Sequence, residues 1–152
     1  SLRFIEFMDV GNHNRWRHND VVPSSEIQNH LKKRMKLIPI DSTYRGEVAQ
    51  RWKVEGKNGF EIGFISSVSQ PFCGDCTRAR ISSDGHLFTC LFASTGTDLK
   101  SILREQSNEN NLQDVISEIW KLRDDRYSEL RSKTKKPGTI ILPKIEMSYI
   151  GG

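Results

Sequence analysis

Residues 71–92 read P-F-C-G-D-C-T-R-A-R-I-S-S-D-G-H-L-F-T-C-L-F, and the rest of the chain is organised around this stretch. It holds all three cysteines of the protein. Cys73 and Cys76 form a C-x-x-C pair, and Cys90 follows a turn signal at residues 83–85. Thiolates are ligands for zinc, copper(I) and iron–sulfur clusters, and a C-x-x-C loop brings two of them to one metal centre. The stretch therefore predicts a loop and hairpin with a metal or redox site.

The number of cysteines separates two kinds of metal site. A closed structural zinc site normally has four protein ligands, and the sequence offers only three cysteines. His86 is a candidate fourth ligand, but an extended strand would separate its Cα from that of Cys90 by about 13 Å. We therefore interpret His86 as an exposed turn residue. Three cysteines suit an iron–sulfur cubane with one open iron, while a zinc-bearing structural domain remains the alternative.

The orientation of Arg78 and Arg80 depends on the length of the hairpin loop. If residues 83–85 form a three-residue loop whose glycine is left-handed, Arg80 pairs with Phe88. Arg78 then lies opposite Cys90, so both guanidinium groups share a face with the third thiolate. A two-residue turn would shift the register and send both arginines to the other face. Beside an open iron they would bind an anion, since guanidinium forks match phosphate oxygens, whereas salt bridging on a β surface is the alternative.

Length and composition limit what the chain could be. A chain of 152 residues with 36% hydrophobic residues can form one domain with a core, whereas a TIM barrel needs about 250 residues. The chain opens without Met on a strand-like run, so we expect a fragment. It has neither a run of about 18 apolar residues nor a signal peptide, which predicts a cytoplasmic protein without a membrane partner. A net charge of +4 fits an anionic partner, either nucleotide phosphate or nucleic acid.

A strand and a helix are predicted near the start of the chain. Residues 3–10 (R-F-I-E-F-M-D-V) predict a strand buried on both faces of a parallel or barrel sheet. The polar loop at 11–22 would follow its carboxyl end, where α/β proteins bind ligands, although a solvated connection fits equally well. A Ser25-x-x-Gln28 capping box opens a helix over residues 25–37.

That helix has two distinct faces. Ile27, Leu31 and Met35 form its apolar face, and Pro39 would end it. The opposite face is basic, with Lys32, Lys33, Arg34 and Lys36. We interpret this basic run as a solvated surface and not as a nucleic-acid patch.

The remaining elements alternate strands, turns and helices. A short strand is predicted at 50–55, a turn at 56–59, and a second strand in which Phe60, Ile62 and Phe64 share one face. After the hairpin, a short helix is predicted over residues 97–104, and a longer one begins at a cap, Asn110 or Asn111. Core packing is predicted for the apolar stripe that follows: Leu112, Val115, Ile116, Ile119, Trp120, Tyr127 and Leu130.

Three separated motifs together resemble one enzyme family. Residues 73–80 (C-G-D-C-T-R-A-R), 83–85 (S-D-G) and 90–92 (C-L-F) resemble the C-terminal cluster motif of the molybdenum cofactor biosynthesis protein A family. Residues 3–8 (R-F-I-E-F-M) are similar to its sixth barrel strand, and residues 151–152 to its double-glycine tail. These proteins are radical S-adenosylmethionine enzymes, the GTP 3′,8-cyclases. The resemblance covers essentially the whole chain.

The resemblance implies a role for each site residue. Cys73, Cys76 and Cys90 would hold a [4Fe–4S] cluster whose fourth iron is ligated by the guanine of GTP. The other implied roles are GTP binding by Arg3, Arg78, Ala79 and Arg80, S-adenosylmethionine contact by Met8, and assistance to radical initiation by the catalytic tail Gly151 and Gly152. In the family, a 5′-deoxyadenosyl radical abstracts hydrogen from the GTP ribose. Carbon 3′ then bonds to purine carbon 8, giving (8S)-3′,8-cyclo-7,8-dihydroguanosine 5′-triphosphate.

One departure from the family pattern limits what the chain could do alone. The family's other cluster cleaves S-adenosylmethionine and is held by an N-terminal C-x-x-x-C-x-x-C, which this sequence lacks together with the earlier barrel strands. We therefore expect the C-terminal substrate-binding part of a cyclase, inactive by itself. Its expected partners are GTP, an upstream radical barrel and, as one possible assembly, a second copy in a homodimer. A basic nucleic-acid-binding module ranks low, because a stacking platform's interleaved aromatic and basic residues are absent.

The predicted fold is α/β (α+β). Residues 1–40 would form the C-terminal end of an incomplete TIM-type barrel, with one strand and one helix. Residues 41–152 would form the iron–sulfur and GTP-binding domain, a small antiparallel sheet with helices that carries the cluster loop and ends in the double-glycine tail.

Overall fold

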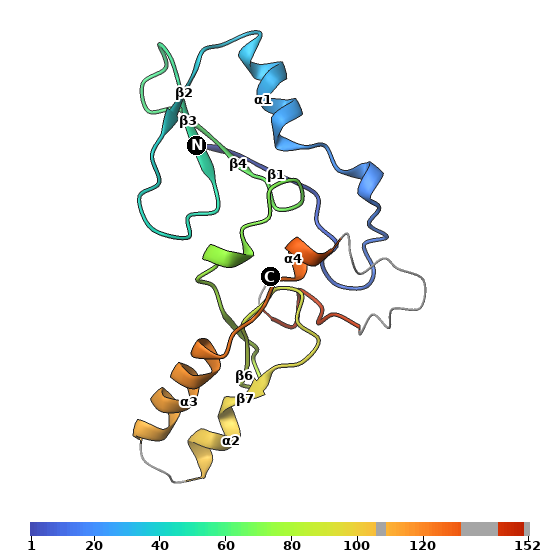
Figure 1. Cartoon of the computed structure of the whole chain (residues 1–152), viewed down its shortest axis with the longest axis vertical. Helices are drawn as coiled ribbons and strands as arrows, with labels where there is room; N and C mark the ends of the chain where they lie inside the picture. Colours follow the sequence, from blue (N-terminus) through green and yellow to red (C-terminus); the bar gives the residue numbers. More distant parts are fainter. Residues whose placement is uncertain (106–108, 132–142, 151–152) are drawn as a thin grey trace. The chain divides into compact units, whose positions relative to one another are not determined.

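The computed structural model describes residues 1–105, 109–131 and 143–150 (Figure 1). The chain forms two compact units with both helices and strands, and each has its own sheet. The first unit comprises Ser1–Asp9 and Trp16–Cys76, and the second Val10–Arg15 and Thr77–Gly152. The predicted mixed class of helices and strands is confirmed. No described helix is long and apolar enough to cross a membrane.

The first unit is built on a four-stranded mixed sheet with the order β1-β4-β3-β2. Its strands are β1 (Leu2–Ile5), β2 (Leu37–Ile40), β3 (Gln50–Val54) and β4 (Glu61–Ile65). Strand β1 runs parallel to β4, whereas β3 is antiparallel to both of its neighbours. The short strand predicted at 50–55 is thus confirmed as β3. A barrel is not confirmed, because the β1–β4 pair is the sheet's parallel pair and the other pairings are antiparallel.

The core of the first unit lies between this sheet and helix α1 (Ser24–Lys32). Ile62 and Phe64 alternate along β4 and are almost completely buried, as the period-two pattern predicts. Phe4 stacks on Phe64 with ring centroids 5.5 Å apart. The predicted packing of the apolar set is confirmed, because Ile27 and Leu31 of α1, and Met35 three residues after the helix end, pack against this core. Phe60 precedes β4 and is exposed.

The strand predicted over residues 3–10 is shorter and more exposed than expected. Strand β1 ends at Ile5 and occupies the edge of the sheet. Leu2 and Ile5 are 45% and 57% exposed, so within this chain the strand is not buried on both faces. The parallel pairing that its apolar run predicted is nevertheless present.

Helix α1 begins and ends differently from the prediction. Its N-cap position is Pro23, without a side-chain cap, so the predicted capping box is wrong. The Ser24 N–H instead donates to the carboxylate of Glu6 at 2.7 Å. The helix ends at Lys32, and Pro39 lies inside β2. Proline is tolerated there because β2 is an edge strand, whose outer N–H groups need no ladder partner.

The second unit carries a three-stranded antiparallel sheet, as predicted, with the order β5-β6-β7. The strands are β5 (Arg80–Ile81), β6 (His86–Phe88) and β7 (Thr97–Asp98), and the helices are α2 (Leu99–Arg104), α3 (Glu109–Lys121) and α4 (Tyr127–Leu130). Leu87, Phe88, Leu99 and Ile150 are its buried apolar residues among those described. Asp98 caps α2 by accepting from the Ser101 N–H at 3.0 Å.

The longer helix departs from its predicted start and packing. Helix α3 begins at Glu109, so neither predicted asparagine is the cap. Tyr127 and Leu130 belong to the separate helix α4. Trp120 and Leu130 are 39% and 40% exposed, and thus the predicted stripe is only partly a core stripe. Helical spacing alone does not reveal where a chain breaks between two helices.

Candidate functional site

The three cysteines divide between the two units. Cys73 and Cys76 belong to the first unit, where η2 (Cys73–Asp75) is a single 3-10 turn and the Cys76 N–H donates to the Cys73 carbonyl at 3.2 Å. Cys90 belongs to the second unit and follows β6. All three are partly buried and none forms a disulfide. They remain available as soft ligands.

The backbone after Cys90 is already arranged around its sulfur. The Phe92 N–H donates to Cys90 Sγ at 3.4 Å, and the Ala93 N–H donates to the Cys90 carbonyl at 3.2 Å. Hydrogen bonds to thiolate sulfur stabilise its charge and tune the potential of iron–sulfur clusters. This turn therefore suits a metal-bound thiolate.

The case for a metal site rests on the chemistry of the three cysteines and not on a cluster of ligands already assembled in the structure. Among the residues that the structure describes, no group of three or more Cys, His, Asp and Glu side chains could hold a metal ion. Three sulfur donors without a disulfide match the chemistry of a cluster with three thiolate ligands.

His86 lies in β6, half-buried, with Nδ1 3.2 Å from Asp84 Oδ2. It is therefore not the exposed turn residue that the sequence predicted.

The hairpin register follows the three-residue alternative. Arg80 pairs with Phe88, and Gly85 has a φ of 94°, in the left-handed region. A Cβ on Gly85 would lie 2.7 Å from Lys100 Cβ, so space as well as backbone conformation requires glycine. Arg80 is half-buried. The pairing of β5 with β6 begins at Arg80 and Phe88, so the predicted position of Arg78 opposite Cys90 stays a prediction. Both Arg78 and Ala79 are exposed.

A hydrogen-bond network surrounds Asp84 at the tip of the hairpin. Ser82 Oγ donates to Asp84 Oδ1 at 2.6 Å, and Tyr149 Oη donates to Asp84 Oδ2 at 2.6 Å. The bond from Ser82 and then that from Tyr149 lower the pKa of Asp84 to about 2. The turn motif hinted at the local Ser82 bond. No sequence signal pointed to Tyr149, which lies 65 residues away.

Arg3 lies on the face of the first sheet opposite to the core. It is paired in register with Gly63, where a Cβ would lie 2.5 Å from Arg3 Cδ, so the arginine side chain crosses the sheet above a glycine. Arg3 Nη2 lies 3.9 Å from Glu61 Oε2, and Arg51 Nη1 lies 3.7 Å from the same oxygen. Glu61 therefore orients two cations on one face. Met8 follows β1 in the first unit and is half-buried.

Sequence reasoning missed the role of Glu6, which lies within the predicted strand. This carboxylate is 4% exposed and accepts four hydrogen bonds, from Ser24 N at 2.7 Å, Val68 N at 2.8 Å, Ser69 N at 2.7 Å and Ser69 Oγ at 2.6 Å. Burial raises its pKa, but the bonds from Ser69, Ser24 and Val68 outweigh burial, so the net pKa is lowered. The sequence did carry a signal for this role: Glu6 is an acidic residue inside an apolar run, and a buried carboxylate needs hydrogen-bond donors around it.

We call this arrangement the Glu6 anchor, comprising the carboxylate and its donors Ser24, Val68 and Ser69. It fastens the turn after β4 to the end of β1 and to the start of α1. The Gln70 N–H closes that turn on the Ser66 carbonyl at 2.9 Å. Because Cys73 follows three residues later, the anchor fixes where the C-x-x-C segment leaves the first sheet.

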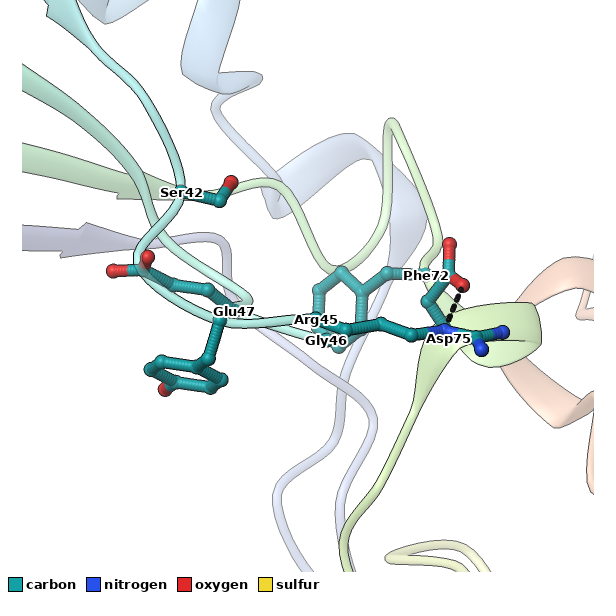
Figure 2. Close-up of a pocket in the computed structure, with 7 residues that line it drawn as sticks. Ser42, Arg45, Gly46, Glu47, Phe72 and Asp75 are labelled. Atoms are coloured by element: carbon teal, nitrogen blue, oxygen red, sulfur yellow. Dashed lines mark ion pairs between the residues drawn. The ribbon is translucent and has the colours of Figure 1, made fainter.

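A cavity of about 310 Å³ lies beside the C-x-x-C turn within the first unit (Figure 2). Its lining residues are Ser42, Tyr44, Arg45, Gly46, Glu47, Phe72 and Asp75. Arg45 Nε lies 3.5 Å from Asp75 Oδ1, which joins the loop before β3 to the cysteine turn (Figure 2). Both side chains are largely exposed, so the pair itself contributes little stability.

The comparisons with known proteins agree with this set of features. A model of the family described as Molybdenum Cofactor Synthesis C matches residues 1–129. The chain belongs to this family. The resemblance found in the sequence motifs is thereby confirmed.

Curated relatives align with nearly the whole chain, beyond the residues that the family model matches. Proteins named GTP 3′,8-cyclase are 51% identical over 154 residues in Xanthomonas campestris pv. campestris (strain B100), 44% over 172 residues in Acidothermus cellulolyticus and 41% over 152 residues in Staphylococcus aureus (strain JH9). Each alignment covers 99% of this chain and 42%, 47% and 44% of the relative, respectively. The chain thus spans less than half the length of these relatives.

Most of the predicted site residues of this Molybdenum Cofactor Synthesis C chain lie in the described part of the structure. Cys73 and Cys76 share one turn, and Arg80 is fixed by the hairpin register. Gly151 and Gly152, the predicted catalytic tail, lie outside the described residues.

Proposed function

We propose that this chain is the C-terminal, substrate-binding part of a GTP 3′,8-cyclase that acts in molybdenum cofactor biosynthesis. The observation that carries the proposal is the pairing of Arg80 with Phe88, two residues before Cys90. This hairpin occurs in a chain that is 51% identical to a protein named GTP 3′,8-cyclase. Such a chain would bind GTP and convert it to (8S)-3′,8-cyclo-7,8-dihydroguanosine 5′-triphosphate only together with a radical source.

Cys73, Cys76 and Cys90 would hold a [4Fe–4S] cluster through their thiolates. When bound, this cluster would supply an open iron to which the guanine of GTP would bind. The absence of disulfides at the three cysteines and the bond from Phe92 N–H to Cys90 Sγ support this assignment. The chain's contribution would be to set the sulfur positions and to stabilise the thiolate charge.

The arginines would hold the nucleotide. Arg78 and Arg80 would bind phosphate oxygens, with Ala79 between them in the same GTP site. Arg3 would contact GTP from the polar face of the first sheet, oriented by Glu61. A preorganised cation of this kind binds an anion without first having to be ordered itself.

The remaining proposed roles depend on an upstream segment. Residues 1–40 would form the end of an incomplete TIM-type barrel. The free edge of β1 would pair with a parallel strand of the upstream segment. That barrel would carry the second cluster and S-adenosylmethionine, which Met8 would contact. Gly151 and Gly152 would form the catalytic tail. A cytoplasmic location and a homodimer remain predictions.

Anaerobic reconstitution of the chain with iron and sulfide tests the cluster assignment. We expect a [4Fe–4S] signal in the Mössbauer spectrum, and a change of the reduced cluster's electron paramagnetic resonance spectrum when GTP is added. Cys90→Ser should abolish the signal. A stoichiometric zinc site without the iron–sulfur signal would favour the structural zinc domain instead.

Two further measurements separate the rival functions. The purified chain alone should not cleave S-adenosylmethionine, and release of 5′-deoxyadenosine from it would contradict the proposed division of labour. A nucleic-acid-binding module would bind generic duplexes with an affinity that falls steeply with salt. The cyclase proposal predicts a preference for GTP over other nucleotides.

A further inference from the structure

The last described segment, residues 143–150, is fastened to the second unit at its upstream end. Lys144 N donates to Asn12 Oδ1 at 3.0 Å, and Asn12 Nδ2 donates back to the Lys144 carbonyl at 2.6 Å. Ile145 N donates to the Ala93 carbonyl at 3.0 Å. The asparagine side chain thus pairs with the backbone as a neighbouring strand would.

Glu146 strengthens the same fastening. Its Oε1 accepts from Asn12 N at 2.9 Å and from Asn12 Nδ2 at 2.8 Å. Gly11 has a φ of 62°, and a Cβ there would lie within contact of the Glu146 carboxylate, so a side chain is excluded on both grounds. The first two residues of the predicted loop at 11–22, Gly11 and Asn12, therefore hold the C-terminal segment.

A second fastening lies at the downstream end, one residue before the described chain ends. Tyr149 Oη donates to Asp84 Oδ2 at 2.6 Å, while the Tyr149 ring meets Phe88 edge-on at 6.2 Å. Tyr149 is 41% exposed, whereas Ile150 is 2% exposed. Burial of Ile150 thus supplies packing, and the tyrosine hydroxyl adds a directional bond at the surface.

The acceptor for this bond is held rigidly. Asp84 already accepts from Ser82 Oγ at 2.6 Å, and the following Gly85 is confined by its left-handed φ and by the nearby Lys100 side chain. A charged acceptor in a fixed turn makes a stronger and more directional hydrogen bond than a neutral one. The 83–85 motif therefore does more than close the hairpin.

We propose that Asp84 and Tyr149 are positioning residues that fix the point from which the chain continues into its last two glycines. The inference deepens the proposed function, because it rests on Gly151 and Gly152 acting as a catalytic tail. A tail that assists radical initiation needs a defined starting point, since displacing a reacting group by about 1 Å can cost about a hundredfold in rate.

The test uses the complete cyclase, with the upstream barrel and both clusters reconstituted, and compares Tyr149→Phe and Asp84→Asn with the unmodified enzyme. Phenylalanine keeps the ring against Phe88 and removes the hydroxyl. We expect kcat for the cyclised product to fall about tenfold, while the GTP KM and the cluster's electron paramagnetic resonance spectrum stay unchanged. Ser101→Ala is a matched control, because Ser101 Oγ donates to Asp98 at the same 2.6 Å in the same unit.

Deletion of Gly151 and Gly152 separates positioning from general stabilisation. In the deletion background, Tyr149→Phe should lower kcat no further, because the group it positions is gone. A further loss there, or full activity of both single variants in the intact enzyme, would overturn the inference while leaving the tail's role in place. If the deletion itself leaves kcat unchanged, the catalytic tail is wrong and the inference fails with it.

Discussion

Two carboxylates fasten the segments that carry the cysteines, and they do so in different ways. Glu6 in the first unit is 4% exposed and accepts from three backbone N–H groups and one hydroxyl. Asp84 in the second unit is half-exposed and accepts from the hydroxyls of Ser82 and Tyr149. The buried carboxylate stabilises its folded unit, because without it the buried Ser24 N–H and the partly buried N–H groups of Val68 and Ser69 would lose their acceptor. The exposed one orients a segment that is already folded.

The largest expected difference is in folding free energy. Glu6→Gln should destabilise the chain by about 3 kcal/mol, because a neutral amide would satisfy the buried Ser24 N–H and the two partly buried backbone donors less well than the carboxylate does. Chemical denaturation followed by circular dichroism measures this. Glu55→Gln is the matched control, since Glu55 pairs with Lys36 at the surface and should change stability by less than about 1 kcal/mol. Equal effects of the two substitutions would break the comparison.

The next difference is in the dependence of stability on acid. The folded pKa of Glu6 is lowered from its usual 4.5, so the stabilisation it provides is complete above that value. It is lost as the pH falls through the lower folded pKa, because the unfolded chain then binds more protons than the folded one. Glu6→Gln should therefore flatten the fall of unfolding free energy below pH 4.5. An unchanged acid slope in this variant would show that other carboxylates control it.

The smallest effect is expected at Tyr149. Its hydrogen bond to Asp84 raises its pKa above 10.0, so the stabilisation from this bond is present below that pH and is lost as the pH rises through the raised pKa. Asp84→Asn should return the pKa toward 10.0. Ultraviolet titration of tyrosinate measures this, with Tyr149→Phe identifying which of the three tyrosines responds. If the Asp84→Asn substitution leaves the titration unaltered, the hydrogen bond is absent in solution.

The features predicted correctly are those set by neighbours in the sequence. The three-residue loop follows from a glycine at position 85 with a left-handed backbone, and it alone fixes the pairing of Arg80. The apolar face of α1 follows from the spacing of Ile27 and Leu31, and Met35 continues the same packing just after the helix. Each of these depends on a few adjacent residues, so the pattern carries the information.

The features that were missed depend on partners distant in the sequence. The predicted capping box at Ser25 does not form, because the carboxylate of Glu6, just after β1, accepts from the N–H at the helix start instead. Pro39 was predicted to end a helix, because the sequence does not reveal that it lies in an edge strand, where proline is tolerated. The contact between Tyr149 and Asp84 has no local pattern at all. Tertiary structure decides such contacts, and a single sequence does not encode them in its spacing.

The Glu6 anchor also has a consequence for how the protein is made. Glu6 and Ser69 are 63 residues apart, so the first strand cannot complete its contacts until most of the unit has left the ribosome. At about 5–20 residues per second, synthesis alone delays this closure by roughly 3–13 s. During that time β1 lacks its β4 partner, and apolar strand edges without a partner favour aggregation. Protection of the nascent chain by a chaperone would therefore be most useful between the synthesis of Glu6 and that of Ser69.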